Sequence, residues 1–200
     1  MRDAVVSSAA TREAILDATD LLLARYGFKK MTIEDLAREV GIGKGSVYLH
    51  FPSKEEIALS HIDRLIERLK VRLRQMAAGE APVEDKLREM LVERVVFRFD
   101  SIQHYTKSLD ELLSNLRTSL LDRRRQYFAD EARILGEVVT DGQAKGVFKD
   151  GDAFDLGRTL VSATNSLLPY SLSAYELGDR NDVADRAKKT ADLLIRGLMC

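Results

Sequence analysis

Cysteine, proline and tryptophan are scarce in this chain, which has one cysteine, Cys200, three prolines and no tryptophan. A single cysteine excludes an intrachain disulfide framework and a cysteine-rich metal site, and it fits a reducing compartment. No apolar run reaches the ~18 residues that a membrane-spanning helix needs. The first ten residues also lack the apolar core of a secretory signal. We therefore expect a cytoplasmic protein that does not enter a membrane.

The chain also has no large excess of positive or negative charge. The sequence has 31 Lys and Arg against 32 Asp and Glu, so its formal net charge is −1. This balance excludes a polycation that would coat nucleic acid along its whole length, and any nucleic-acid contact must come from a local surface. Hydrophobic residues make up 45% of the chain, which excludes a disordered composition.

Apolar residues recur at helical spacing along most of the chain, and runs that alternate with period two are few. This pattern predicts an all-α fold. Capping residues, glycines and prolines then divide the sequence into expected helices near 11–26, 32–40, 44–50, 53–76, 83–98, 100–120, 121–145, 152–175 and 181–198. A short joint, Ala77 to Pro82, follows the fourth of these helices.

The segment from Met31 to Lys54 carries the strongest local pattern. Thr32 can cap a short helix that ends before Gly41, and a second short helix follows before Phe51 and Pro52. Ala37 and Val47 flank the glycine at a spacing that lets both reach one small core. Two short helices joined by a tight turn that contains glycine predict a helix-turn-helix.

The residues of this segment resemble the DNA-binding signature of the tetracycline-repressor (TetR) family of bacterial regulators. The resemblance covers about residues 11–56 and rests on Arg25-Tyr26-Gly27-Phe28, Thr32-Ile33, Leu36-Ala37, Val40-Gly41-Ile42, Gly45-Ser46-Val47-Tyr48, His50-Phe51 and Lys54. Two positions depart from the family pattern. Gly43 stands where Ser or Thr is more frequent, which removes one helix cap and one phosphate contact, and Leu49 stands where an aromatic residue is common.

The resemblance implies two functional parts within the all-α chain. Residues 1–54 would form a three-helix DNA-binding domain, backed by the start of helix 53–76. Residues 55–200 would form a helical domain for ligand binding and dimerisation. The implied function is that of a homodimeric transcriptional regulator, most often a repressor, which a small-molecule effector releases from a palindromic DNA operator.

The resemblance also implies which residues contact double-stranded DNA. The helix from Lys44 to His50 would enter the major groove, where Lys44 and Leu49 would meet base edges and Ser46 would reach either a base or a phosphate. Gly45 would let the backbone come close to the DNA. The phosphate contacts, which set register rather than sequence, would come from Thr32, Tyr48, His50 and Lys54.

The remaining helices would bind the effector and the second subunit. We expect effector contacts at Phe97, His104, Tyr105, Asn115, Tyr127, Asn165 and Tyr170. We expect the dimer interface to use the apolar stripes of the last two helices, with Leu156, Leu160, Leu167, Ala187, Ala191, Leu194 and Leu198. The pattern alone leaves open that these stripes are buried within their own domain.

Motifs for catalysis and for cofactors are absent from the sequence. There is no His-Glu-x-x-His, no Gly-x-Ser-x-Gly, and no Walker or dinucleotide glycine pattern around Gly41 to Ser46. We therefore expect no catalytic residue, metal or cofactor. Two other classes stay open, namely a helical enzyme or carrier that does not bind DNA, and a protein-interaction scaffold.

Overall fold

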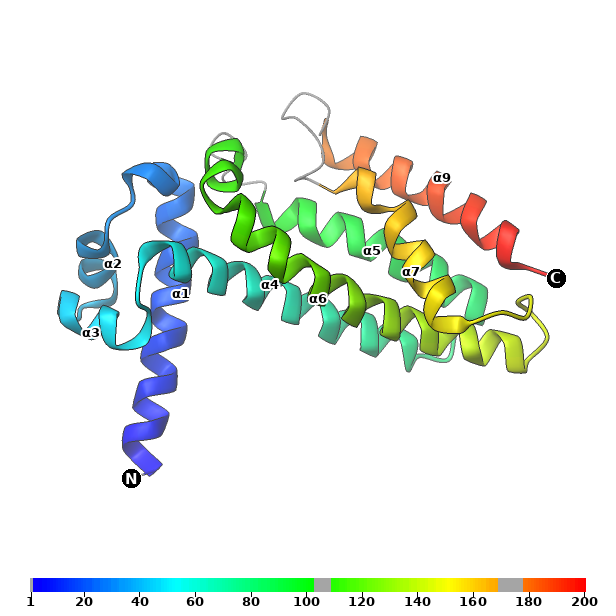
Figure 1. Cartoon of the computed structure of the whole chain (residues 1–200), viewed down its shortest axis with the longest axis horizontal. Coiled ribbons are helices and arrows are strands. Elements are labelled where there is room, and N and C mark those ends of the chain that lie inside the picture. The colour runs from blue at the N-terminus through cyan, green and yellow to red at the C-terminus, as the bar shows by residue number, and fades with distance from the viewer. Residues whose placement is uncertain (1, 103–108, 169–177) are drawn as a thin grey trace. The chain divides into compact units, whose positions relative to one another are not determined.

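A computed structural model describes residues 2–102, 109–168 and 178–200, with side chains for all of these except residues 2–7 and 109–113. Within these ranges every regular element is a helix, and the only β pairing is an isolated bridge between Phe148 and Met199. The helices form two compact units (Figure 1). The first comprises Met1–Arg64 and His104–Leu120, and the second comprises Leu65–Gln103 and Leu121–Cys200.

The first unit contains α1 (Arg2–Lys30), α2 (Ile33–Val40), α3 (Lys44–His50) and the start of α4 (Lys54–Ala77). The bounds predicted for α2 and α3 are confirmed. The predicted start of the first helix at Thr11 is wrong, because no proline or glycine precedes Thr11 and the helix extends back to Arg2. Gly27 interrupts α1 with φ +75°, a conformation that glycine adopts without a steric penalty.

Side chains from all four helices make the core of this unit. Ile15 of α1, Leu36 of α2 and Val47 of α3 are all fully buried. Burying side chains of this size is worth about 1.5–3 kcal/mol each relative to exposing them. Helices as short as α2 and α3 are unstable in isolation, so this shared core is what keeps them folded and holds their outer faces in place.

The second unit contains α5 (Val83–Ile102), most of α6 (Leu109–Ala144), α7 (Ala153–Ala163), a 3₁₀ turn (Asn165–Leu167) and α9 (Arg180–Leu198). Two predicted helices, 100–120 and 121–145, are corrected. They are replaced by the end of α5 and by the single helix α6, since no proline or glycine interrupts the sequence from Leu109 to Leu135. The helix expected over 152–175 ends at Ala163, and positions 169–175 of that expected helix lie outside the described residues.

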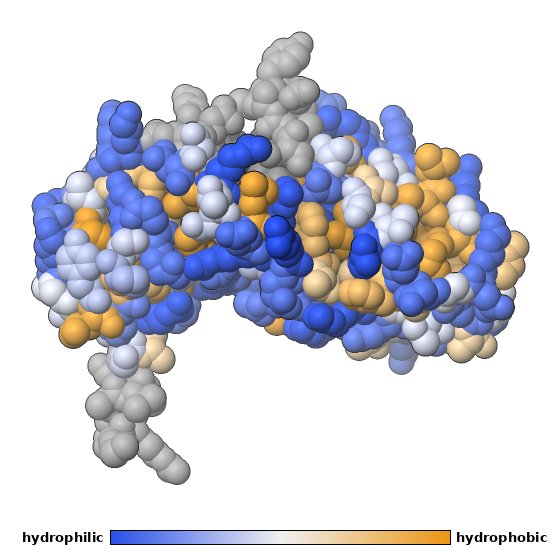
Figure 2. Space-filling model, in the orientation of Figure 1, coloured by the Kyte–Doolittle hydropathy of each residue, from blue (hydrophilic) through white to orange (hydrophobic). Residues whose placement is uncertain are grey.

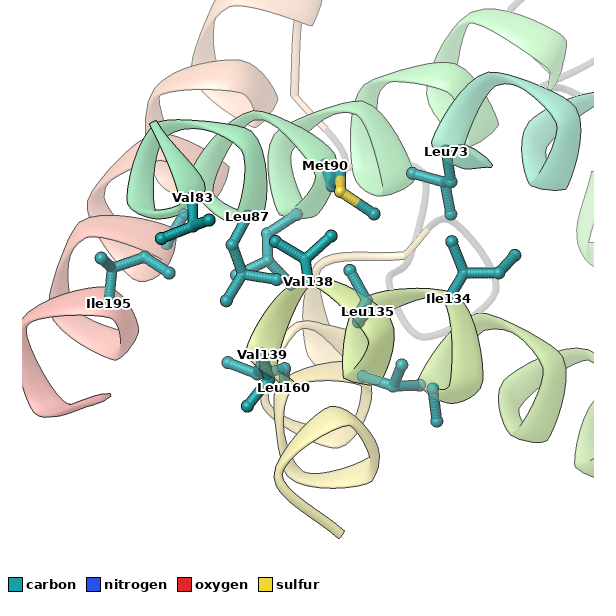
Figure 3. Close-up of a cluster of buried hydrophobic side chains, with 14 of the residues drawn as sticks. Leu73, Val83, Leu87, Met90, Ile134, Leu135, Val138, Val139, Leu160 and Ile195 are labelled. Carbon is teal, nitrogen blue, oxygen red and sulfur yellow. The ribbon is translucent and has the colours of Figure 1, made fainter. Parts of the chain in front are cut away.

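Leucine, isoleucine and valine side chains from α4, α5, α6, α7 and α9 make the main core of the second unit (Figure 3). Helices α5 and α9 pack along one another in opposite directions. Arg88, near the start of α5, donates from Nε to Asp192 Oδ1 at 2.7 Å near the end of α9. At the opposite ends, Arg180 makes two hydrogen bonds to Asp100, at 2.8 and 2.9 Å.

This core buries part of the predicted dimer interface. Leu160, Ala187 and Ala191 are each at most 2% exposed and pack within their own unit. Figure 3 shows Leu160 of α7 among the core side chains. The small alanines let α9 approach α5 closely, so they serve the fold of one chain. The other four predicted interface residues, Leu156, Leu167, Leu194 and Leu198, are partly buried against the same clusters.

Hydrophilic side chains occupy much of the surface of each unit in the space-filling view (Figure 2). Among the side chains that the structure describes, the most exposed large apolar ones are Leu49 on α3, at 86%, and Leu193 on α9, at 73%. Of the described helices, none is both long enough and apolar enough to span a lipid bilayer.

Candidate nucleic-acid interface

A capping box fixes the start of α2. The backbone N–H of Asp35 donates to Thr32 Oγ1 at 3.1 Å, and the backbone N–H of Thr32 donates to Asp35 Oδ2 at 3.2 Å. The Thr32 hydroxyl also donates to Asp35 Oδ2 at 2.7 Å, and this hydrogen bond is the main reason that the pKa of Asp35 lies below its ordinary value. The side chain of Thr32 therefore already caps a helix, and a DNA phosphate would have to share it.

Gly41 makes the turn between α2 and α3. Its φ of +76° and ψ of 32° lie in the left-handed region, which side chains with a Cβ atom rarely adopt. The next N–H, that of Ile42, donates to the carbonyl of Ala37 at 2.9 Å and closes the end of α2. This turn brings α3 back against α2, with Val47 as its fully buried anchor.

The other face of α3 points to solvent. Lys44, Gly45, Tyr48 and Leu49 are exposed, with Leu49 at 86% and Tyr48 at 47%. Ser46 and His50 are half-buried. A helix that buries one valine and exposes a lysine, a tyrosine and a leucine on its far side has the form of a reading helix for the major groove. That these side chains contact DNA stays a prediction.

Lys44, at the start of α3, forms an ion pair with Glu34 in the first turn of α2. The hydrogen bond between them is the main cause of two pKa shifts, since it lowers the pKa of Glu34 and raises that of Lys44. Both side chains are about half exposed, at 49% for Lys44 and 55% for Glu34. The sequence analysis did not identify Glu34 as a functional residue. Opposite charges in the first turns of two adjacent helices were the signal that could have indicated its ion pair with Lys44.

Lys54 points toward the protein rather than toward solvent. Its ammonium group donates to the carbonyl oxygens of Phe28, Lys29 and Met31, at 3.0, 3.4 and 3.2 Å. It also lies 4.5 Å from the centre of the Phe28 ring, within the range of a cation–π contact. Three acceptors match the three N–H donors of a lysine. In this structure Lys54 therefore satisfies the carbonyls at the end of α1, whereas the sequence predicted a phosphate contact.

Gly45 has no structural requirement for glycine. Its φ is not positive, and a Cβ atom there would meet nothing within 4 Å. Replacing Gly45 with alanine is therefore expected to stabilise the protein by about 0.5–1 kcal/mol, because alanine loses less backbone entropy in a helix. If Gly45 faces DNA closely, the same change weakens duplex binding. Thermal unfolding and duplex titration of one preparation check both expectations, and unchanged affinity would show that DNA does not approach this position.

The predicted effector contacts are spread over both units. Phe97 is half-buried on α5, with the Arg72 guanidinium 5.0 Å from the centre of its ring. Tyr127 and Asn165 are half-buried in the second unit, while Asn115 is exposed on the stretch of α6 that belongs to the first unit. His104, Tyr105 and Tyr170 lie outside the described residues. The effector contacts therefore stay a prediction.

Buried charges in the second unit escaped the sequence analysis. The fully buried Glu131 of α6 accepts from Arg94 Nε at 2.6 Å and from Arg98 Nη2 at 2.5 Å, both on α5. Arg94 also donates from Nη1 to Thr164 Oγ1 at 2.8 Å, just after the end of α7. The spacing of four residues between Arg94 and Arg98 indicated only that the two arginines share a face of one helix. Nothing near them in the sequence indicated that Glu131 is their partner.

The charge state of Glu131 follows from two opposing effects. Burial disfavours the ionised carboxylate and by itself would raise its pKa. The charges of Arg98 and Arg94, with the hydrogen bonds they donate, outweigh burial and hold the pKa of Glu131 below its ordinary value. Glu131 is therefore an ionised carboxylate that holds α5 and α6 together from inside the core.

Comparison with known proteins places these features in a family. The family model described as bacterial regulatory proteins, tetR family, matches residues 15–60, which include all of α2 and α3. The chain is 23% identical over 188 residues to the fatty acid metabolism regulator protein of Bacillus subtilis (strain 168), covering 92% of this chain and 93% of that protein. It is 25% identical over 152 residues to the HTH-type transcriptional repressor KstR2 of Mycobacterium tuberculosis, covering 72% of each.

The fold of almost the whole chain is also found among solved structures. The structure of the SmeT–triclosan complex superposes with a TM-score of 0.68 at 20% identity, covering 96% of this chain and 92% of that one. At this level of identity the likeness shows a shared fold for both units, while the family model matches residues 15–60, within the first unit.

Proposed function

Because the chain belongs to the TetR family of bacterial DNA-binding regulators, we propose that it is a homodimeric transcriptional repressor that a small molecule releases from a palindromic operator. The observation that carries this proposal is the arrangement of α2 and α3. Val47 anchors α3 in the core, and the opposite face of α3 presents Lys44, Tyr48 and Leu49 to solvent.

The size of the reading helix supports a two-fold dimer. One α3 of seven residues can reach only a few base pairs, and helix-turn-helix proteins gain affinity by placing two such helices about 34 Å apart, one DNA turn. We propose that the outer faces of α7 and α9 form the dimer contact. Phe154, 40% exposed, and Leu193, 73% exposed, supply apolar surface there, together with the exposed parts of the predicted residues Leu156, Leu167, Leu194 and Leu198.

Release by an effector is supported by the relatives and by the second unit. The superposed SmeT structure is a complex with triclosan, a small molecule. In this chain, the predicted effector residues Phe97 and Tyr127 lie half-buried in the second unit. Suppose that the effector binds more tightly to a conformation in which the two reading helices are at the wrong spacing for the operator. It would then lower operator affinity by the ratio of its affinities for the two conformations.

Selection of bound sites from a pool of random duplexes tests the proposed function directly. The purified chain is expected to enrich a sequence with two inverted half-sites whose centres lie about 10 base pairs apart or at a multiple of that spacing. Sedimentation of the free protein at the same concentration reports whether it is a dimer. A monomer that enriches no sequence at low salt would contradict the proposal.

Lys44 is expected to set part of the sequence preference. Replacing Lys44 with alanine should lower affinity for the selected duplex about 5- to 150-fold, since a specific contact to a guanine edge contributes about 1–3 kcal/mol. Repeating the selection with this variant should flatten the base preference at one position in each half-site. If the preference is unchanged at every position, Lys44 does not read a base.

A further inference from the structure

The cations of the helix-turn-helix segment are already paired within the protein. From Thr32 to Lys54 the chain has as many acidic residues as basic ones, namely Glu34, Asp35 and Glu39 against Arg38, Lys44 and Lys54. Arg38 lies 3.2 Å from Asp35, Lys44 pairs with Glu34, and Lys54 donates to carbonyls at the end of α1. The segment that would face DNA therefore offers little uncompensated positive charge to the phosphates.

The ion pair between Glu34 and Lys44 joins the two helices at the exposed edge. A lysine ammonium group has three N–H donors, and Glu34 Oε1 accepts one of them. Two donors remain, and the major-groove edge of guanine presents two acceptors, O6 and N7. The paired cytosine presents an N4 amino donor beside them, which suits a carboxylate oxygen. The exposed pair thus carries donors and an acceptor in the combination that a G·C pair requires.

We propose that Glu34 is a specificity-determining residue, which positions the Lys44 ammonium for a guanine edge and keeps it from binding phosphates indiscriminately. This inference rests on the proposed function. A lysine that moved from Glu34 to a phosphate would exchange one anionic oxygen for another and would leave Glu34 facing the DNA backbone with its charge uncompensated. Lys44 therefore adds little affinity for DNA of arbitrary sequence. A guanine at the right position accepts hydrogen bonds from the N–H donors of Lys44 that Glu34 does not occupy.

The replacement Glu34→Gln tests this assignment, because it removes the charge and keeps the shape. Two duplexes of equal length serve as probes, the one recovered by selection and one of random sequence. Affinity for the random duplex is expected to rise about two- to fivefold, because Lys44 becomes available to phosphates. The slope of log K against log salt concentration should become more negative by up to about 0.9, the value for one additional phosphate contact. The ratio of selected to random affinity should fall.

Glu39→Gln is the matched control. Like Glu34, Glu39 is on α2 and pairs with a basic residue of the same unit, in its case Arg25 at 3.5 Å. Glu39→Gln changes the net charge by the same amount as Glu34→Gln, but it does not break an ion pair to a residue of α3. The replacement Glu34→Asp keeps the charge, so the ratio of selected-duplex to random-duplex affinity should stay close to that of the unaltered protein. In a Lys44→Ala background, Glu34→Gln should affect random-duplex affinity no more than Glu39→Gln does.

The outcomes separate this inference from the proposed function. If the unaltered protein binds no duplex, the proposed function fails. If it binds its selected duplex and the Glu34→Gln and Glu39→Gln variants show the same random-duplex affinity and the same salt slope, Glu34 does not govern specificity and the proposed function stands. Because Glu34 is exposed, all variants are expected to fold, which their thermal unfolding curves verify.

Discussion

Replacing Glu131 with glutamine is expected to lower the free energy of unfolding of the second unit by about 3–5 kcal/mol, because removing one member of a buried ionic group leaves its partners buried and uncompensated. Glu131 and Arg94 are both 0% exposed, and Arg98 is 7% exposed. Glutamine keeps the volume and one acceptor oxygen but loses the charge that both guanidinium groups face. Urea-induced unfolding followed by circular dichroism measures the difference.

An exposed pair at the end of the same helix provides the control. Asp141 in the last turn of α6 and Lys145, the first residue after α6, lie 2.8 Å apart, with side chains 42% and 57% exposed. Replacing Asp141 with asparagine should change the free energy of unfolding by no more than about 0.5 kcal/mol. A Glu131→Gln variant that is as stable as this control would refute the structural role of the buried carboxylate.

The pH dependence of the same variant gives a second test. The pKa of Glu131 is lower in the folded chain than its ordinary value, so ionisation of Glu131 adds stability that is fully present above its unfolded-state pKa. That contribution is lost as the pH falls through the lower, folded-state pKa. The stability difference between the unaltered protein and the Glu131→Gln variant should therefore be largest at neutral pH and shrink in this acidic range. A difference that does not change with pH would contradict this account.

Replacing Gly157 with alanine is expected to destabilise the second unit by about 1–3 kcal/mol, the usual effect of forcing an atom into a packed core. Gly157 lies on α7 where the helix crosses α6. A Cβ atom there would be 2.3 Å from the carbonyl oxygen of Ala132 and 3.2 Å from the backbone nitrogen of Gly136. Both are backbone atoms, so the helices would have to separate. Denaturant unfolding monitored by circular dichroism measures the loss.

Gly197 on α9 is the control for this substitution, since a Cβ atom there would meet nothing within 4 Å. In a helix, alanine is favoured over glycine by about 1 kcal/mol, so Gly197→Ala should leave stability unchanged or raise it. Opposite signs for the two glycines would establish that close contact between α6 and α7 requires Gly157. Equal effects would mean that the two helices can move apart at little cost.

Local signals in the sequence determined α2, α3 and the turn between them. Thr32 caps α2, Gly41 supplies the positive φ, and Phe51 with Pro52 ends α3. Each of these signals depends only on residues close together in the sequence, so the sequence alone is enough to recognise it. The TetR resemblance rested on the same residues, and the match of the family model to residues 15–60 confirms it.

Tertiary structure decided the features that join distant segments. The apolar stripe of α9 indicated that Ala187 and Ala191 lie on a buried face, but the position of α5 decided that this face belongs to the chain's own core. Likewise, Lys54 found its acceptors 23 to 26 residues back along the chain, and Glu131 found arginines 33 and 37 residues away. The period of a helix specifies which side chains share a face. Only the packed arrangement of helices determines what that face meets.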